Sequence, residues 1–141
     1  MRMPANKRTD AYLDVVEQAG LSALVREVEF VKPDDEKGAV VAKILDENPD
    51  IDGIFAGDDT MAAICLNVMK QRGLSAPDDI KVVGADGARR TMTFMPDLTT
   101  VRQDIDRIGE LAAQSIIALI NGDNPESNIK LPVELIEGKT A

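Results

Sequence analysis

Apolar residues along the chain follow two different spacings. In some stretches they recur every three to four residues, which is typical of amphipathic helices. In others they form short, nearly continuous runs bounded by turn residues, which is typical of buried strands. The stretches with helical spacing are residues 7–19, from the Pro33–Asp35 turn to Asn48, 61–69 and 104–121. The runs that indicate strands are 25–31, 51–56, 80–84, 98–101 and 131–136.

Because these helices and strands alternate, the pattern predicts an α/β fold with a mostly parallel sheet and helices on both faces. The stretch 61–69 is almost continuously apolar, so we expect a buried helix. Cys65 lies inside it and is expected to pack as a small hydrophobic residue rather than to act as a nucleophile. Met92, Phe94 and Met95 form an apolar loop, which either joins the core or contacts a partner.

The composition excludes several classes of function. The 141 residues suit one domain or a large part of one. With 16 Lys and Arg against 25 Asp and Glu, the net charge is −9, so this segment is not expected to bind DNA itself. One cysteine and no histidine exclude an internal disulfide and a histidine-based triad, and they leave no metal or cofactor to expect. No apolar run suits a membrane span and no secretory signal opens the chain, so we expect a cytoplasmic protein without a membrane partner.

Polar residues follow two of the expected strands at their carboxyl ends, where open α/β sheets bind ligands. Asp58 follows the run 51–56, and Asp86 follows the run 80–84. A carboxylate there accepts hydrogen bonds from sugar hydroxyls, and Arg8 in the first helix would add a planar cation. Plainer interpretations stay open, because Asp58 or Asp59 could cap a helix, Asp86 could form a turn with Gly87, and Arg8 could be solvated.

Three blocks of sequence are specific when taken together. They read IFAGDDTMA at 54–62, GLSAPDDIKVVGAD at 73–86 and PDLTTVRQD at 96–104, with Ile108-Gly109 after them. In this order and spacing, the chain resembles the effector-binding domain of the lactose/galactose repressor family, which has the type I periplasmic-binding-protein fold. The resemblance extends from about Arg8 to Ile136.

The resemblance implies a small-molecule site rather than a catalytic or metal centre. It assigns ligand contacts to Arg8, Asp58, Asp86 and Gln103. The implied ligand is a sugar or a sugar phosphate, and no cofactor is implied. Binding of this effector would close two subdomains and bias a helix-turn-helix headpiece, which this chain lacks, so that DNA is contacted only through that headpiece. A homodimer is also implied.

The resemblance further implies an incomplete domain. Residues 1–103 and 129–141 would form the C-terminal subdomain, and the helix and linker at 104–128 would pack in a missing N-terminal subdomain. A helix whose apolar stripe has no partner exposes a large patch. We therefore expect the chain to self-associate, for example by swapping the helix at 104–121, or to be less stable than its composition suggests.

Two other functions compete with a regulator. A periplasmic sugar-binding protein of an ABC-type transporter shares this fold. However, the residues of the motifs at 73–86 and 96–104 resemble those of the repressors. An enzyme would use Asp58, Asp59 and Asp86 as acid and base or to hold Mg²⁺. Their spacing is not the D-x-D-x-T of aspartate phosphatases, so we expect no enzymatic activity.

Overall fold

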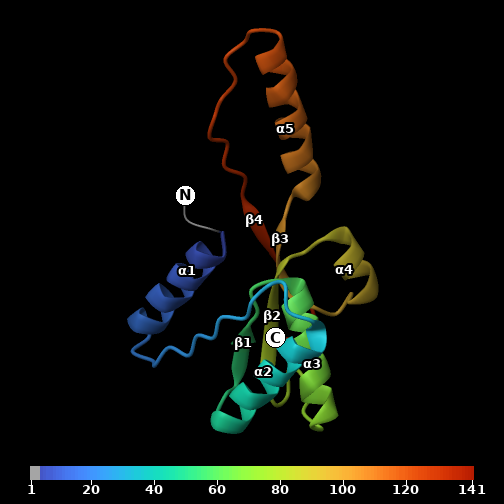
Figure 1. Cartoon of the computed structure of the whole chain (residues 1–141). Helices are drawn as coiled ribbons and strands as arrows, with labels where there is room; N and C mark the ends of the chain where they lie inside the picture. Colours follow the sequence, from blue (N-terminus) through green and yellow to red (C-terminus); the bar gives the residue numbers. More distant parts are fainter. Residues whose placement is uncertain (1–3) are drawn as a thin grey trace.

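Four strands form one sheet in the order β1-β2-β3-β4 (Figure 1). The structure is a computed structural model and describes residues 4–141. Strands β1, β2 and β3 are parallel, and β4 joins β3 in the antiparallel sense. The mixed α/β class with a mostly parallel sheet, predicted from the alternating pattern, is therefore confirmed. The strands are β1 (Gly53–Phe55), β2 (Lys81–Asp86), β3 (Thr99–Gln103) and β4 (Val133–Ile136).

The helices lie where the periodicity predicts them. A further short helix, α4, lies where an apolar loop was expected. None of its residues is buried, so this segment has no core residues whose spacing could have predicted a helix. The helices are α1 (Pro4–Gln18), α2 (Asp34–Glu47), α3 (Asp59–Gln71), α4 (Arg89–Phe94) and α5 (Ile105–Ile120).

The core lies between one face of the sheet and the helices α2 and α3. Val82 on β2 is 0% exposed, and Met69 on α3 and Leu98 before β3 are 1% exposed each. Helix α3 is apolar around most of its circumference because it packs against both the sheet and α2. These two helices and the sheet form a compact body, which we call the lobe and define as residues 34–103 with 133–141.

The strand predicted at 25–31 is wrong. Residues 21–29 have no regular secondary structure, and Phe30 and Val31 are 84% and 85% exposed. A strand is stabilised by hydrogen bonds to a neighbour, and β1 has only three residues and pairs with β2 alone in the described part of the chain. The apolar alternation in this segment is also imperfect. A strand here would therefore bury few side chains, and this burial would not make up for weak hydrogen bonding to a neighbouring strand.

A second region projects from the lobe. Helix α5 continues from β3 away from the sheet, and residues 121–132 return beside it to β4 (Figure 1). No residue of α5 is buried. We call residues 104–132 the arm. The structure does not test the prediction that this helix and linker pack in another subdomain, and it stays a prediction.

Candidate functional site

The carboxyl ends of the parallel strands bring the predicted residues to one edge of the sheet. Gly57 follows β1, Asp86 ends β2 and Gln103 ends β3. Arg8 reaches this edge from α1, which lies in the chain before any strand of the sheet. The edge is therefore assembled from four elements that are distant in sequence.

Asp86 lies at the centre of the hydrogen bonds at this edge. Arg8 donates from Nη2 to Oδ1 of Asp86 at 2.6 Å, and Gln103 donates from Nε2 to the same oxygen at 2.6 Å. Arg8 also donates from Nη1 to the carbonyl oxygen of Gly57 at 2.5 Å. The Arg8 and Asp86 side chains are 29% and 36% exposed, so the cluster is open to solvent. Three of the four residues assigned by the resemblance are thus in contact.

Asp58 occupies the N-cap of α3. Its Oδ1 accepts a hydrogen bond from the backbone N–H of Met61 at 2.8 Å, which satisfies a free donor of the first helical turn. The capping interpretation is therefore correct. Within residues 4–141 no hydrogen bond joins the Asp58 side chain to Arg8, Asp86 or Gln103, although the neighbouring Gly57 is bound by Arg8.

The backbone at the end of β2 adopts an unusual conformation. Asp86 has φ = +105°, a region that residues with a side chain rarely adopt, and Gly87 follows with φ = +59°. A Cβ atom on Gly87 would lie 2.6 Å from Cβ of Arg102. The turn therefore requires glycine at this position. The Asp86-Gly87 pair forms this turn and also places the carboxylate that Arg8 and Gln103 bind.

Asp59, which the sequence offered only as a helix cap or as an acid, base or Mg²⁺ ligand, has a structural role. It is 3% exposed, and both of its carboxylate oxygens accept hydrogen bonds. Thr100 donates from Oγ1 to Oδ1 at 2.5 Å, and the backbone N–H of Gly87 donates to Oδ2 at 2.9 Å. The pair of adjacent aspartates was the available signal, because only one of them can cap the helix.

The edge has a free acceptor beside its cation. Oδ2 of Asp86 receives no hydrogen bond from the described residues, and the charge of Arg8 is paired with the same carboxylate. A carboxylate oxygen of this kind accepts from hydroxyl or amide donors. The edge can therefore bind a molecule that is rich in hydroxyl groups.

The described residues do not point to a reactive cysteine, a metal site or a membrane-spanning helix. Burial raises the pKa of the Cys65 thiol to about 11, so it stays protonated at neutral pH. No group of three or more histidine, cysteine, aspartate or glutamate side chains in residues 4–141 is arranged to hold a metal ion. None of the helices seen in that part is long and apolar enough to cross a membrane.

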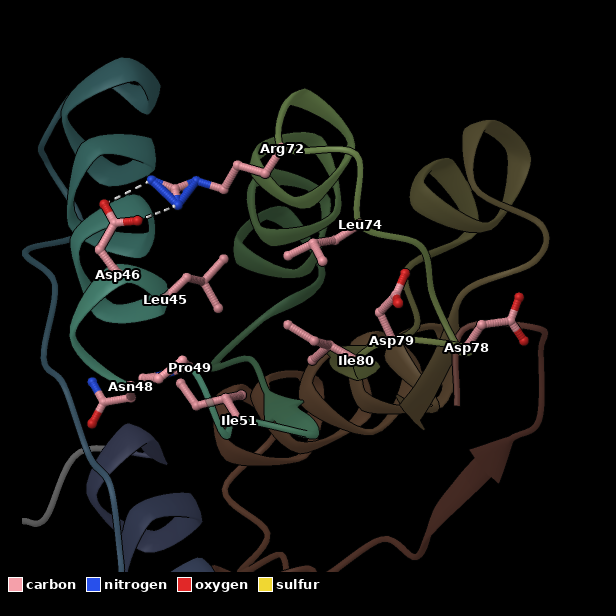
Figure 2. A pocket seen from close by; sticks show the side chains of 10 residues that line it. All are labelled: Leu45, Asp46, Asn48, Pro49, Ile51, Arg72, Leu74, Asp78, Asp79 and Ile80. Carbon is pink, nitrogen blue, oxygen red and sulfur yellow. Dashed lines mark hydrogen bonds and ion pairs between the residues drawn. The ribbon is translucent and has the colours of Figure 1, made fainter.

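A groove of about 680 Å³ opens at the opposite, amino-terminal edge of the sheet (Figure 2). Leu45 and Ile80, which also belong to the core, form part of its floor. Arg72 at its rim donates two hydrogen bonds of 2.9 Å to the carboxylate of Asp46. Arg72, the one cation among the described residues that line this groove, is thus paired, and those residues form no cluster comparable to that at Asp86.

Comparison with known proteins gives a consistent result. A family model described as a periplasmic binding protein-like domain matches residues 2–141. The ribose operon repressor of Halalkalibacterium halodurans is 31% identical over 97% of this chain. The sucrose operon repressor of Pediococcus pentosaceus is 34% identical over 98% of it. The chain spans 41% and 43% of the lengths of these two curated relatives.

A solved structure shows the same arrangement. The complex of the transcriptional regulator CelR with cellobiose superposes with a TM-score of 0.82 at 28% identity. The superposition covers 95% of this chain and 42% of that protein. The fold seen here, arm included, is therefore the fold of part of a larger regulator.

Proposed function

The chain belongs to the periplasmic binding protein-like domain family, and from this premise we propose that it binds a sugar effector as part of a transcription regulator. Its relatives are operon repressors, which confirms the resemblance to the lactose/galactose repressor family. They also favour a regulator over the transport receptor that the sequence left open. Because these relatives are regulators and not enzymes, they give no support to a catalytic role for the aspartates.

The observation that carries the proposal is the cluster at Asp86. Arg8 and Gln103 both donate to Oδ1, which leaves Oδ2 to accept from a ligand. Arg8 and Gln103 would then orient the carboxylate, while Asp86 receives the ligand's hydroxyl groups. We propose Asp58 as a fourth contact, since it lies next to the Gly57 carbonyl that Arg8 binds.

Of the two ligand classes implied by the resemblance, a neutral sugar fits this edge better than a sugar phosphate. The positive charge of Arg8 is already paired with the Asp86 carboxylate, so it offers little net attraction to a phosphate. Asp58 and Asp86 would repel a phosphate dianion, whereas they accept hydrogen bonds from hydroxyl groups. The first sugars to test are ribose and sucrose, after the operons that two relatives repress, and cellobiose, which is bound in the CelR complex.

The proposed regulation runs through Gln103. This residue ends β3, and Asp104, which caps α5 by accepting from Arg107 N at 2.9 Å, comes directly after it. A ligand that changes the bonds of Asp86 therefore acts at the base of the arm. Effector binding would shift the population of arm orientations. DNA contact through a separate headpiece and assembly as a homodimer are parts of the same proposal, and the net charge of −9 supports a separate DNA-binding module.

Isothermal titration calorimetry tests the proposal on the protein expressed from its complete reading frame. The probes are ribose, sucrose and cellobiose, with glucose 6-phosphate as the phosphorylated comparison. We expect one neutral sugar to bind, and Asp86→Asn to weaken its binding by roughly tenfold or more, because a charged acceptor is lost.

The matched control is Asp97→Asn. Asp97 is also an exposed carboxylate in an ion pair, with Lys139, but it precedes β3 at the opposite edge of the sheet. This variant should bind the sugar as the parent protein does. Binding of none of the sugars, or equal affinities for Asp86→Asn and the parent protein, would contradict the proposed function.

A further inference from the structure

Asp59 lies beneath the proposed ligand edge and is not among the residues that the resemblance assigns to it. It is the first residue of α3 and is 3% exposed. A carboxylate is buried at a high cost unless hydrogen bonds replace its hydration. The position therefore needs partners, and the identity of those partners shows what the residue does.

Both partners belong to the strands that carry the site. Oδ1 accepts from Thr100 Oγ1 on β3, and Oδ2 accepts from the backbone N–H of Gly87 directly after β2. Gly84 lets the carboxylate approach this closely, because a Cβ atom there would lie 2.5 Å from Oδ1 of Asp59. One buried side chain thus joins the start of α3 to β3 and to the turn that follows β2.

The bond to Gly87 acts on the peptide unit that follows Asp86. Asp86 is held at φ = +105°, which an aspartate rarely adopts without support. Because the Gly87 N–H belongs to the peptide group between the two residues, its bond to Asp59 fixes the orientation of that group. The direction in which Asp86 presents its carboxylate to Arg8 and Gln103 depends on this orientation.

We propose that Asp59 is a positioning residue of the effector site, which holds the Asp86–Gly87 turn and thereby sets the affinity for a neutral sugar. The effect on affinity rests on the proposed function. The effect on the geometry of Asp86 does not, because it concerns contacts within this chain alone.

Three substitutions separate positioning from burial and charge. Asp59→Ala removes both hydrogen bonds. Asp59→Asn has the same shape, its amide oxygen can accept from Gly87 N–H, and its NH₂ group can donate to Thr100 Oγ1. Thr100→Val removes the other buried bond and leaves the bond to Gly87 intact. It is therefore the matched control for loss of a buried hydrogen bond that does not hold the turn.

Two readouts apply to the protein expressed from its complete reading frame. The first is the affinity for ribose, sucrose or cellobiose, whichever binds the parent protein. The second is the set of NMR resonances of the Gln103 side-chain amide and the Gly87 backbone amide, which needs no ligand. We expect Asp59→Ala to weaken binding by roughly tenfold or more and to shift both resonances, whereas Asp59→Asn and Thr100→Val stay within roughly threefold.

Several outcomes would overturn the inference. One is a folded Asp59→Ala variant with parental Gln103 and Gly87 resonances, and another is an Asp59→Asn variant that loses as much affinity as Asp59→Ala. If Asp59→Ala does not fold, hydrogen exchange in the parent protein decides the question. The Gly87 amide should exchange at least about a hundred times more slowly than an open amide, and fast exchange would exclude the bond to Asp59.

The two proposals can fail separately. If none of the sugars binds the parent protein, the proposed function is wrong. The resonances of Gln103 and Gly87 still show whether Asp59 positions Asp86. If a sugar binds and the resonances do not respond to Asp59→Ala, the function stands and the positioning role does not.

Discussion

Helices α3 in the lobe and α5 in the arm have similar apolar sequences and opposite environments. Six residues of α3 are buried, among them Ala62 at 0% and Met69 at 1% exposed. None of α5 is buried, and Ile120 is 78% exposed. The apolar pattern of each segment predicts a helix. The difference shows that the periodicity of a helix reveals that it has an apolar face, and not what covers that face.

The same difference separates two kinds of stability. In the lobe, helix α3 gains its stability from packing between the sheet and α2, so its side chains belong to one cooperative unit. In the arm, the return segment lies beside α5 without burying any of its residues (Figure 1). A long exposed apolar face is typical of a surface that meets another body. The predictions below test whether the two regions differ in this way.

The largest effect is expected from truncating equivalent apolar residues in the two helices. Met69→Ala removes a fully buried side chain and should lower the free energy of unfolding by about 2–5 kcal/mol. Ile120→Ala removes an exposed one and should change it by less than about 0.5 kcal/mol. Urea unfolding followed by circular dichroism measures both. Similar losses in the two variants would show that the arm is part of the lobe's core.

Association of the arm gives the next effect. Because α5 exposes its apolar face, we expect the chain to self-associate, and Ile117→Asp to weaken this association at least about tenfold, or about 1.4 kcal/mol. Light scattering over a range of concentrations measures it. Val15→Asp is the control, since Val15 is 65% exposed on α1 and Ile117 is 59% exposed on α5. A monomer at every concentration would remove the arm as an association surface.

The fold could be predicted from the sequence where local spacing decides the outcome. The helices α1, α2, α3 and α5 and the four strands lie at their expected positions, because their apolar period matches the elements that they form. The strand expected at 25–31 failed because pairing depends on a neighbour that the pattern does not show. Helix α4 was missed because it buries no residue and so has no apolar period.

The site was only partly predictable, for a different reason. The cap at Asp58 follows from a local rule, and the structure has it. The end of a predicted strand pointed to Asp86, with Arg8 as a candidate cation, whereas Gln103 was assigned only by the family resemblance. Arg8 and Gln103 are 78 and 17 residues from Asp86 along the chain, so no local rule shows that both bind to it. The burial of Asp59 depends on Thr100, 41 residues away, which no spacing rule detects.

A smaller effect is expected from ion pairs in the two regions. In the lobe, Arg72, the C-cap residue of α3, forms two parallel hydrogen bonds to Asp46 on α2. In the arm, Arg107 and Glu110 form one bond within α5. Asp46→Asn should cost about 0.5–1 kcal/mol of unfolding free energy and Glu110→Gln about 0.2–0.5 kcal/mol.

Salt provides the check on these two pairs. Raising the ionic strength should reduce both losses, because all four side chains are at least partly exposed. The order of the two losses should persist, since only the pair in the lobe joins two helices. Equal losses would mean that the lobe gains nothing from the bidentate geometry of Arg72.

The smallest effect concerns the acid limit of the lobe's stability. The backbone N–H of Ser75, and then its hydroxyl, donate to Asp79 and lower the pKa of that carboxyl below its ordinary value of 3.8. A group whose pKa is lower in the folded state stabilises the fold above its unfolded pKa. That contribution is lost as the pH falls through the folded value. The stability of the lobe should therefore fall on acidification below about pH 4, partly through Asp79.

Asp79→Asn should flatten this acid dependence slightly, and urea unfolding at several pH values between about 3 and 6 measures it. Asp123→Asn, at the turn where the arm reverses, is the matched control, because the Asp123 carboxylate accepts no hydrogen bond from residues 4–141. Because Asp79 is fully exposed, the change will be smaller than those above, yet its location is informative. If Asp123→Asn flattened the curve and Asp79→Asn did not, acid unfolding would begin in the arm. The arm would then contribute to the stability that we assign to the lobe alone.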